Sequence, residues 1–288
     1  MNKKIIDLYG ILKIGDTQPT VMMGVLNLSP ESFYQGSVYA DLQKLKKATK
    51  SMVMNEAKIL DLGARSTAPW SKKITVEEEL ERLLPAMELV SSIIPNDILI
   101  SVDTQYMKVA EEAFKISERY DKKIIINDVS CLKTDPKLGE FIIKNNLPCI
   151  LMASKEIPGD ICTIKEIKNQ FVKTKEELGK KGYDTDKIIL DPGIGHWIEE
   201  KTPECDLRII TNLDVLKPLQ NPILVAISRK SFIGAILNRP NPEDRLSGTL
   251  AATAIAVYNG AHIVRTHDVN EQLNDIIKMA TELRFHKK

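Results

Sequence analysis

The sequence LVAISRKSFIG, residues 224–234, contains an apolar run, an abrupt polar turn and the start of a second apolar segment. This order predicts a buried strand followed by a short helix. Because side chains alternate along a strand, Ala226, Ser228 and Lys230 share one face while Arg229 points the other way. We expect Arg229 to be a solvated or interface residue. Burying an unpaired lysine charge is costly, so Lys230 predicts a functional site at this strand end.

The same strand-then-helix pattern recurs along the chain. Seven further segments read as strands, at residues 20–26, 57–63, 97–104, 123–130, 148–154, 187–195 and 261–269. Eight such units without a break in composition predict a parallel sheet with helices outside, closed into an α/β (β/α)8 TIM barrel. An open doubly wound sheet is the alternative, but eight similar units favour closure. We expect residues 1–19 to form an N-terminal hairpin extension and residues 20–288 a single barrel domain.

Composition is that of an ordinary globular protein, with 43% hydrophobic and 27% charged residues in 288. The net charge of +1 provides no global field for nucleic acid or an anionic membrane, so neither is an expected partner. No apolar run is long enough to span a bilayer. The four cysteines show no CxxC spacing. We therefore expect a cytoplasmic protein with reduced thiols.

Polar residues stand at nearly every predicted strand end, where the active site of such a barrel lies. Four of these residues together suit a flat heterocycle with a guanidine-like edge and a carbonyl: Asp103, Asn127, Asp191 and Lys230. A carboxylate accepts from paired N–H donors, and a lysine donates to a ring oxygen or nitrogen. Some strand-end carboxylates have simpler interpretations. Asp61 can anchor its own loop, and Asp128 and Asp268 read as helix N-caps.

A second group of polar residues suits a phosphate or diphosphate. Arg265 and His267 are two apart on one predicted strand, so both can point into the mouth of the barrel. Backbone N–H groups of nearby loops would complete such a site. Asn27, Ser66 and Thr67 are further candidate donors or metal contacts.

Seven segments, in order, resemble the motifs of the dihydropteroate synthase family. They are MGVLNLSPESF (23–33), LDLGARST (60–67), ISVDT (100–104), INDVS (126–130), DPGIG (191–195), SRKSFIG (228–234) and RLSGTLAATAIAVYNGAHIVRTHDV (245–269). The resemblance implies a homodimeric transferase of folate biosynthesis. It would join 6-hydroxymethyl-7,8-dihydropterin diphosphate to para-aminobenzoate, with Mg2+ on the diphosphate.

The resemblance also assigns roles to residues of this chain. The pterin would be held by Asp103, Asn127, Met152, Asp191 and Lys230, of which Asp103, Asp191 and Lys230 would be catalytic. The diphosphate would be held by Asn27, Ser66, Thr67, Arg265 and His267, with Asn27 near the metal. Ser231 and His196 would face the second substrate.

The chain departs from the family pattern on the para-aminobenzoate side. The departures are Gln35 and Ser37 in the first loop, Arg65 and Ala68 in the second, Ala153, and His196, Trp197 and Ile198 after DPGIG. We hypothesise that pterin recognition is retained and that the second substrate is another arylamine or is held differently.

Two alternative functions remain open at this point. One is a methyltransferase that moves a methyl group from a reduced pterin to a corrinoid protein. Arg265 and His267 argue against it, because a methyl donor needs no diphosphate site. The other is a pterin-binding protein without catalysis, which the changed loop residues favour.

Overall fold

The computed structural model describes residues 5–29, 39, 41–66 and 71–287. Eight strands form one parallel sheet in the order β8-β7-β6-β5-β4-β3-β10-β9, and two more form a separate antiparallel sheet. The barrel strands are β3 (Val21–Asn27), β4 (Ala57–Gly63), β5 (Leu99–Asp103), β6 (Ile124–Asp128), β7 (Cys149–Met152), β8 (Ile188–Asp191), β9 (Leu224–Ala226) and β10 (Ile263–Thr266).

The two outer strands of the large sheet meet and close it. A parallel bridge joins Leu190 of β8 to Ile223, immediately before β9. The Leu190 N–H also donates to the Pro222 carbonyl at 2.8 Å. The predicted (β/α)8 barrel is therefore confirmed, and the open doubly wound sheet is excluded.

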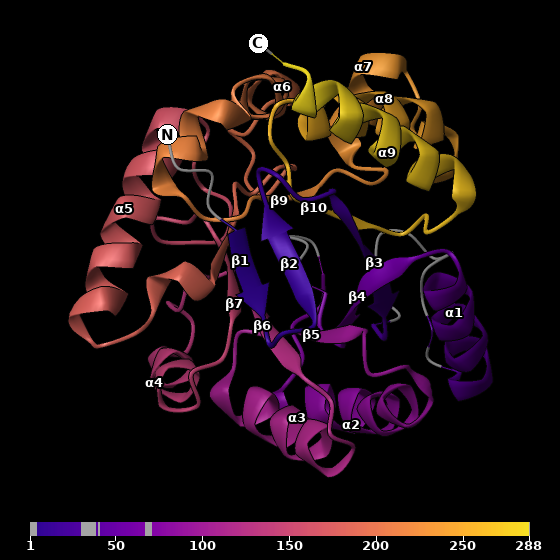
Figure 1. The fold of residues 1–288 in the computed structure, drawn as a ribbon, viewed down its shortest axis with the longest axis vertical. Coiled ribbons are helices and arrows are strands. Elements are labelled where there is room, and N and C mark those ends of the chain that lie inside the picture. Colours follow the sequence, from indigo (N-terminus) through magenta and orange to yellow (C-terminus); the bar gives the residue numbers. More distant parts are fainter. Residues whose placement is uncertain (1–4, 30–38, 40, 67–70, 288) are drawn as a thin grey trace.

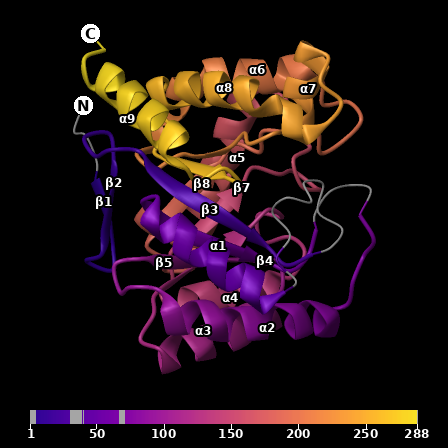
Figure 2. The same cartoon turned by 90° about the vertical axis from the view of Figure 1, so that its right-hand side faces the viewer.

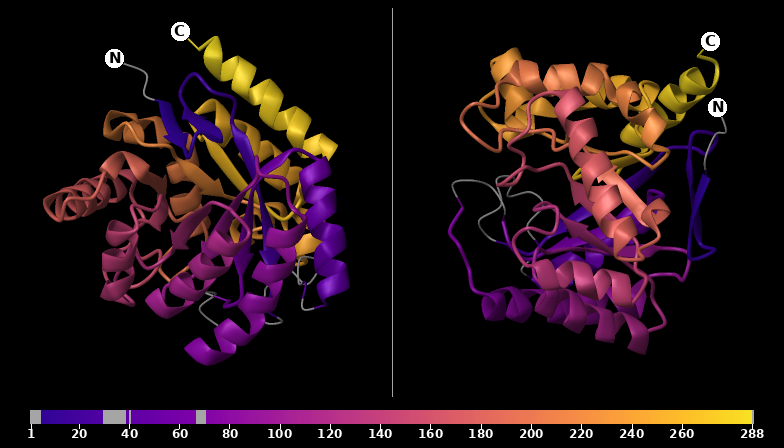
Figure 3. Two further views of the ribbon diagram at one scale, coloured as in Figure 1. Left: turned by 60° about the horizontal axis from the view of Figure 1, so that its bottom comes forward. Right: turned by 90° about the vertical axis from the view of Figure 1, so that its left-hand side faces the viewer.

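Helices surround the barrel on its outside (Figures 1 and 3). They are α1 (Leu42–Met54), α2 (Val76–Ile93), α3 (Met107–Arg119), α4 (Pro136–Lys144), α5 (Ile164–Lys180), α6 (Pro203–Thr211), α7 (Ser231–Leu237), α8 (Leu246–Tyr258) and α9 (Glu271–Phe285), with 3-10 turns η2 (Thr185–Lys187), η3 (Leu213–Leu219) and η4 (Pro242–Arg245). The outward apolar side chains of the strands pack against these helices in one large cluster, which supplies most of the buried core.

The predicted N-terminal hairpin is present as β1 (Ile5–Leu8) and β2 (Leu12–Gly15), and it lies across one end of the barrel (Figure 2). Its inward side chains Ile6, Leu8, Leu12 and Ile14 join a second cluster with residues from the first halves of the barrel strands. The Tyr9 hydroxyl donates to the carbonyl of Ile124 at 2.7 Å. The hairpin thus plugs the amino-terminal end, so the polar residues of the opposite end form the accessible mouth.

No helix within the described residues is both long enough and apolar enough to cross a membrane.

Candidate active site

Four strand ends deliver polar groups that bond directly to one another. Arg265 of β10 donates from Nε to Asp61 Oδ2 at 2.7 Å and from Nη2 to Asp103 Oδ2 at 2.9 Å. Asn127 of β6 donates to Asp61 Oδ1 at 3.3 Å. Parallel register places Asp103 level with Asn127, whereas Asp61 pairs with Ser101 and Arg265 with Met23. The four side chains nevertheless meet through these hydrogen bonds.

One guanidinium serves two carboxylates in this layer. Asp61 is fully buried and Arg265 is largely so. Burial, reinforced by the negative charge of Asp61, raises the pKa of Asp103 to about 8, although Arg265 opposes the rise. Burial alone would lower the pKa of Arg265, but Asp61 and Asp103 hold that pKa above its usual value. Asp103 therefore holds its proton to higher pH than an ordinary aspartate, and positive charge developing beside it would favour its ionised form.

Asp191 and Lys230 form the adjoining part of the site. Asp191 ends β8 and accepts a hydrogen bond from the Gly193 N–H at 2.8 Å. The Lys230 ammonium donates to the Ile194 carbonyl. Burial raises the pKa of Asp191, with Lys230 opposing, and burial lowers the pKa of Lys230 to about 8, with Asp191 opposing. The charge of each group thus favours the charged form of the other.

A glycine makes room for the lysine. Gly195 has φ +125°, and a Cβ on it would lie 3.0 Å from Lys230 Cδ and 3.1 Å from its Nζ. Any other residue would push the ammonium away from the Ile194 carbonyl. The sequence DPGIG therefore both turns the chain after β8 and leaves space for the side chain of Lys230, which precedes α7.

His267 lies beside this cluster as a neutral imidazole. Its Nδ1 is 3.0 Å from the Ser228 hydroxyl. Burial first, and then the positive charges of Arg265 and Lys230, lower its pKa to about 3. At neutral pH His267 offers a hydrogen-bonding ring without a charge, so its contribution to anion binding would come from an N–H donor.

The other predicted site residues are placed around the same mouth. Asn27 ends β3, and its backbone carbonyl accepts from the Tyr39 N–H at 2.7 Å. Ser66 Oγ is 2.5 Å from Ser71 Oγ, while Thr67 lies outside the described residues. Met152 is buried at the end of β7. Ser231 is the exposed first residue of α7, and exposed His196 places Nδ1 3.0 Å from the Lys201 carbonyl.

Three interpretations of single residues are wrong. Arg229 is neither solvated nor at an interface: it is buried and binds Asp268 through two hydrogen bonds of 2.8 and 2.7 Å. Asp268 therefore pairs with an arginine, and helix α9 is capped by Asn270 instead. Asp128 holds the turn after β6 by accepting from the Ser130 N–H at 2.7 Å and does not cap a helix.

Asp61 contributes more than the loop anchor that its sequence position allows. It bonds to Arg265 and Asn127 in the centre of the site. The position of Asp61 near a strand end indicates a site residue, but nothing in the sequence identifies Arg265 and Asn127 as its partners. Lys201 and Asp206, which contact the turn after β8, carry no such signal because neither stands at a strand end.

A protein-family comparison matches residues 23–267 to a model described as pterin binding enzyme. Dihydropteroate synthase of Bacillus subtilis is 34% identical over 254 residues, which span 88% of this chain and 85% of that protein. The synthase of Clostridium beijerinckii is 36% identical over 264 residues, spanning 90% and 94%.

The chain belongs to the dihydropteroate synthase family.

A solved member of the dihydropteroate synthase family has the same fold. The enzyme of Coxiella burnetii, in complex with pteroic acid, superposes with a TM-score of 0.84 at 32% identity and covers 98% of this chain and 99% of its own. Family membership makes this chain a transferase. It also confirms the resemblance drawn from the seven motifs.

The departures from the dihydropteroate synthase pattern have structural explanations where they fall in the described residues. Arg65 is committed to a buried ion pair with Glu79 at 2.6 Å and lies over the Tyr106 ring. Trp197 packs on Gly159, and the Lys230 ammonium is 5.4 Å from the centre of its ring. Ala153 is buried at the end of β7. Gln35, Ser37 and Ala68 lie outside the described residues.

Proposed function

We propose that this protein condenses 6-hydroxymethyl-7,8-dihydropterin diphosphate with para-aminobenzoate or another arylamine and releases diphosphate, as a step of folate biosynthesis. The observation that carries this proposal is the gathering of Asp103, Asp191, Lys230 and Arg265 at one end of the barrel. The set combines two carboxylates for the N–H edge of a pterin with two cations for its carbonyl and the diphosphate.

The pterin ring would lie against Asp103, Asn127, Asp191 and Lys230. The carboxylates would accept from the paired N–H groups of the ring, the Asn127 amide would both donate and accept, and Lys230 would donate to a ring oxygen or nitrogen. Met152 would provide an apolar surface on the slot, since it is buried against Gly193.

Transfer requires charge to separate at the exocyclic methylene. As the C–O bond to the diphosphate breaks, positive charge develops on the methylene and spreads into the pterin ring, and the electron pair leaves with the diphosphate. Asp103 and Asp191 would stabilise the cation, while Arg265 and a His267 N–H would take up charge on the leaving group. The arylamine nitrogen then bonds to the methylene and loses a proton. No covalent nucleophile from the protein is needed.

Mg2+ on the diphosphate is part of the proposal. No cluster of three or more His, Cys, Asp or Glu side chains suited to a metal occurs among the described residues. A magnesium ion held mainly by substrate phosphates and water needs few protein contacts, and we propose the Asn27 amide oxygen as one of them. When bound, the ion would neutralise charge on the leaving diphosphate. Ser66 and Thr67 would add hydroxyl donors to the same phosphates.

The second substrate would enter on the side of Ser231 and His196. Both side chains are available there, because Ser231 is exposed at the start of α7 and His196 is exposed after the turn of β8. Trp197 adds an aromatic surface between Gly159 and Lys230. We therefore propose an arylamine, with para-aminobenzoate as the first one to test.

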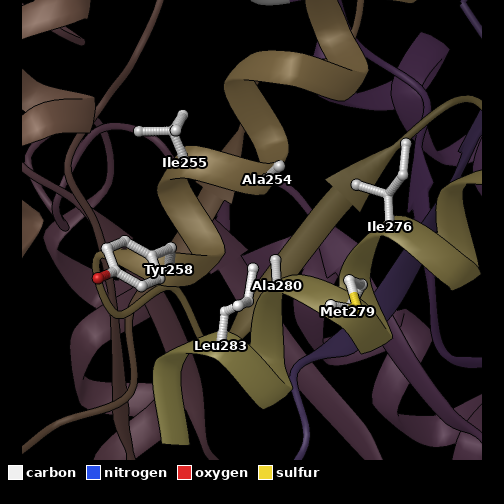
Figure 4. Close-up of a pocket in the computed structure, with 7 residues that line it drawn as sticks. All are labelled: Ala254, Ile255, Tyr258, Ile276, Met279, Ala280 and Leu283. Carbon is white, nitrogen blue, oxygen red and sulfur yellow. The ribbon is translucent and has the colours of Figure 1, made fainter. Parts of the chain in front are cut away.

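We also propose that the protein works as a cytoplasmic homodimer. Helices α8 and α9 bear an apolar groove of about 380 Å³ on the outside of the barrel, lined by Ile255, Tyr258, Met279 and Leu283 among others (Figure 4). Ile255, Met279 and Leu283 are 48%, 60% and 50% exposed, a loss of apolar burial that a second copy would recover. The four cysteines are free thiols, which suits a reducing compartment.

Diphosphate release tests the proposed function against its alternatives. The pterin diphosphate is incubated with the protein and Mg2+, with and without para-aminobenzoate. Release that depends on the arylamine supports the transferase. Binding of the pterin without any release would favour a non-catalytic pterin-binding protein. A separate incubation with a methylated reduced pterin and a corrinoid protein tests the methyltransferase, which methyl transfer there, without diphosphate release in the first assay, would favour.

A further inference from the structure

The turn that carries Asp191 is held from behind by two buried charged residues outside the proposed substrate contacts. Lys201, in the segment before α6, donates from its ammonium to the Gly193 carbonyl and, at 3.5 Å, to the Gly159 carbonyl. Asp206, within α6, accepts from the Gly195 N–H through Oδ1 at 2.8 Å. The turn is thus held by side-chain hydrogen bonds at two backbone groups, the Gly193 carbonyl and the Gly195 N–H.

Lys201 and Asp206 both lie in the protein interior, where a charged group is energetically unfavourable. Lys201 and Asp206 are each 1% exposed. Burial lowers the pKa of Lys201 and raises the pKa of Asp206, and in each case the charge of the other opposes the shift. Asp206 Oδ2 has no hydrogen-bond partner within the described part of the chain. Burying these two charges costs free energy of folding, which indicates that Lys201 and Asp206 serve a purpose other than stability.

The held turn fixes both groups proposed to bind the pterin. The Gly193 N–H donates to Asp191 at 2.8 Å, and the Ile194 carbonyl accepts from Lys230. Lys201 and Asp206 bind the carbonyl of Gly193 and the N–H of Gly195, on either side of Ile194. The Gly195 N–H and the Ile194 carbonyl belong to one peptide unit, so rotation of that unit would move the acceptor of Lys230. The Gly193 carbonyl and the Gly193 N–H flank the same Cα, so a backbone shift at Gly193 would move the donor to Asp191.

We propose that Lys201 and Asp206 are positioning residues that set Asp191 and Lys230 for binding of the pterin diphosphate. The proposal rests on the proposed function, because it concerns the same substrate. Neither residue touches the ligand in this account. Their effect passes through the backbone of residues 193–195, so their loss misplaces two ligand contacts at once.

The test compares Lys201→Met with Lys122→Met. Lys122 is a matched control, since it is also a buried lysine, 8% exposed, whose ammonium donates to a backbone carbonyl, that of Ile94, at 2.9 Å. It precedes β6 and lies away from the carboxyl ends of the strands. Tm, the Kd for the pterin diphosphate, kcat and both KM values are measured for each variant, below the Tm of the weaker one.

For Lys201→Met we expect the Kd and KM for the pterin diphosphate to rise about tenfold and kcat to fall about tenfold, because misplaced contacts weaken both binding and the reacting geometry. The KM for para-aminobenzoate should stay within about twofold. Lys122→Met should lower Tm and leave the Kd, kcat and both KM values unchanged. Equal constants in the two variants would overturn the proposal.

Asp206→Asn provides the second variant, because the amide keeps an oxygen that can accept from the Gly195 N–H. We expect a pterin Kd close to that of the wild type for Asp206→Asn and a Kd about tenfold higher for Asp206→Ala. An unchanged Kd in Asp206→Ala would overturn the proposal even if Lys201→Met fails to fold. Product formation by the wild-type protein in the same assay reports separately on the proposed function.

Discussion

Arg265 Nη2 lies 2.9 Å from Asp103 Oδ2. The same nitrogen lies 2.6 Å from Asp61 Oδ2, so a single positive charge is shared by two carboxyl groups. Because the site has one charge too few for both carboxylates, burial and Asp61 keep the pKa of Asp103 at about 8. This arrangement has a consequence for stability that can be measured without any substrate.

The first prediction concerns the pH dependence of folding. The unfolded chain releases the Asp103 proton near pH 4, whereas the folded protein holds it until about pH 8. Between these values the folded state binds more protons, so this group makes stability fall as pH rises. Asp103→Asn cannot release a proton, so the free energy of unfolding of the variant minus that of the wild type should increase from pH 5 to pH 8. Urea titrations at several pH values measure it, and a constant difference would contradict the prediction.

The second prediction separates binding from turnover. Lys230→Ala should raise the Kd for the pterin diphosphate by about 10- to 100-fold, since a charge-assisted hydrogen bond is lost. Wild-type affinity should also weaken above pH 8, where Lys230 loses its proton. Isothermal titration measures both effects, and the loss of affinity above pH 8 should be smaller in the variant, in which Asp103 still titrates in this range. Wild-type affinity in Lys230→Ala would remove this residue from the pterin site.

The third prediction concerns the leaving group. Arg265→Ala should lower kcat by about 100-fold with a smaller change in pterin Kd, because charge on the diphosphate is greatest as the bond breaks. The variant also leaves Asp61 and Asp103 unpaired, so Tm should fall. Arg265→Lys controls for this, since it keeps a positive charge and should recover Tm more than kcat. A kcat unchanged in Arg265→Ala would show that the guanidinium does not act on the leaving group.

The fourth prediction contrasts a buried ion pair with an exposed one. Arg229 and Asp268 are 8% and 12% exposed, and removing Arg229 would leave the Asp268 carboxylate uncompensated. Arg229→Met should cost about 3–5 kcal/mol of unfolding free energy. Lys58→Met, which breaks the exposed contact of Lys58 with Asp97 at 3.2 Å, should cost less than about 1 kcal/mol. Chemical denaturation measures both, and equal losses would contradict the prediction.

The fifth prediction addresses the proposed dimer. Met279→Glu places a charge in the groove between α8 and α9 and should convert a dimer to a monomer in sedimentation experiments. Met54→Glu is the control, because Met54 is 83% exposed at the end of α1 and lies outside the groove. A dimer that survives Met279→Glu would place the interface elsewhere.

Much of the fold follows from the sequence because strand and helix periodicities repeat eight times. The predicted strand at residues 57–63 coincides with β4, and each of the other seven predicted strands contains most or all of an observed one. Residue type and position near the strand ends were sufficient to predict that Asp103, Asp191, Lys230 and Arg265 come together, because the carboxyl ends of all eight strands of such a barrel open at the same end.

The sequence did not predict which charged side chains pair with one another. Arg229 was expected at the surface because a strand alternates, but it has a left-handed backbone at φ 56° and lies beyond the end of β9. Its side chain therefore turns inward to Asp268. Asp61, Lys201 and Asp206 find their partners across 8 to 204 positions of sequence. Such contacts depend on tertiary geometry, which local patterns do not contain.

The most direct test of the proposed transfer is the mass of its product. The protein is incubated with 6-hydroxymethyl-7,8-dihydropterin diphosphate, Mg2+ and either para-aminobenzoate or another arylamine from a panel, and products are identified by mass spectrometry. We predict the mass of the pterin joined to an arylamine through the methylene, with one diphosphate released per product. Consumption of neither substrate across the panel, by protein that binds the pterin diphosphate, would contradict the account.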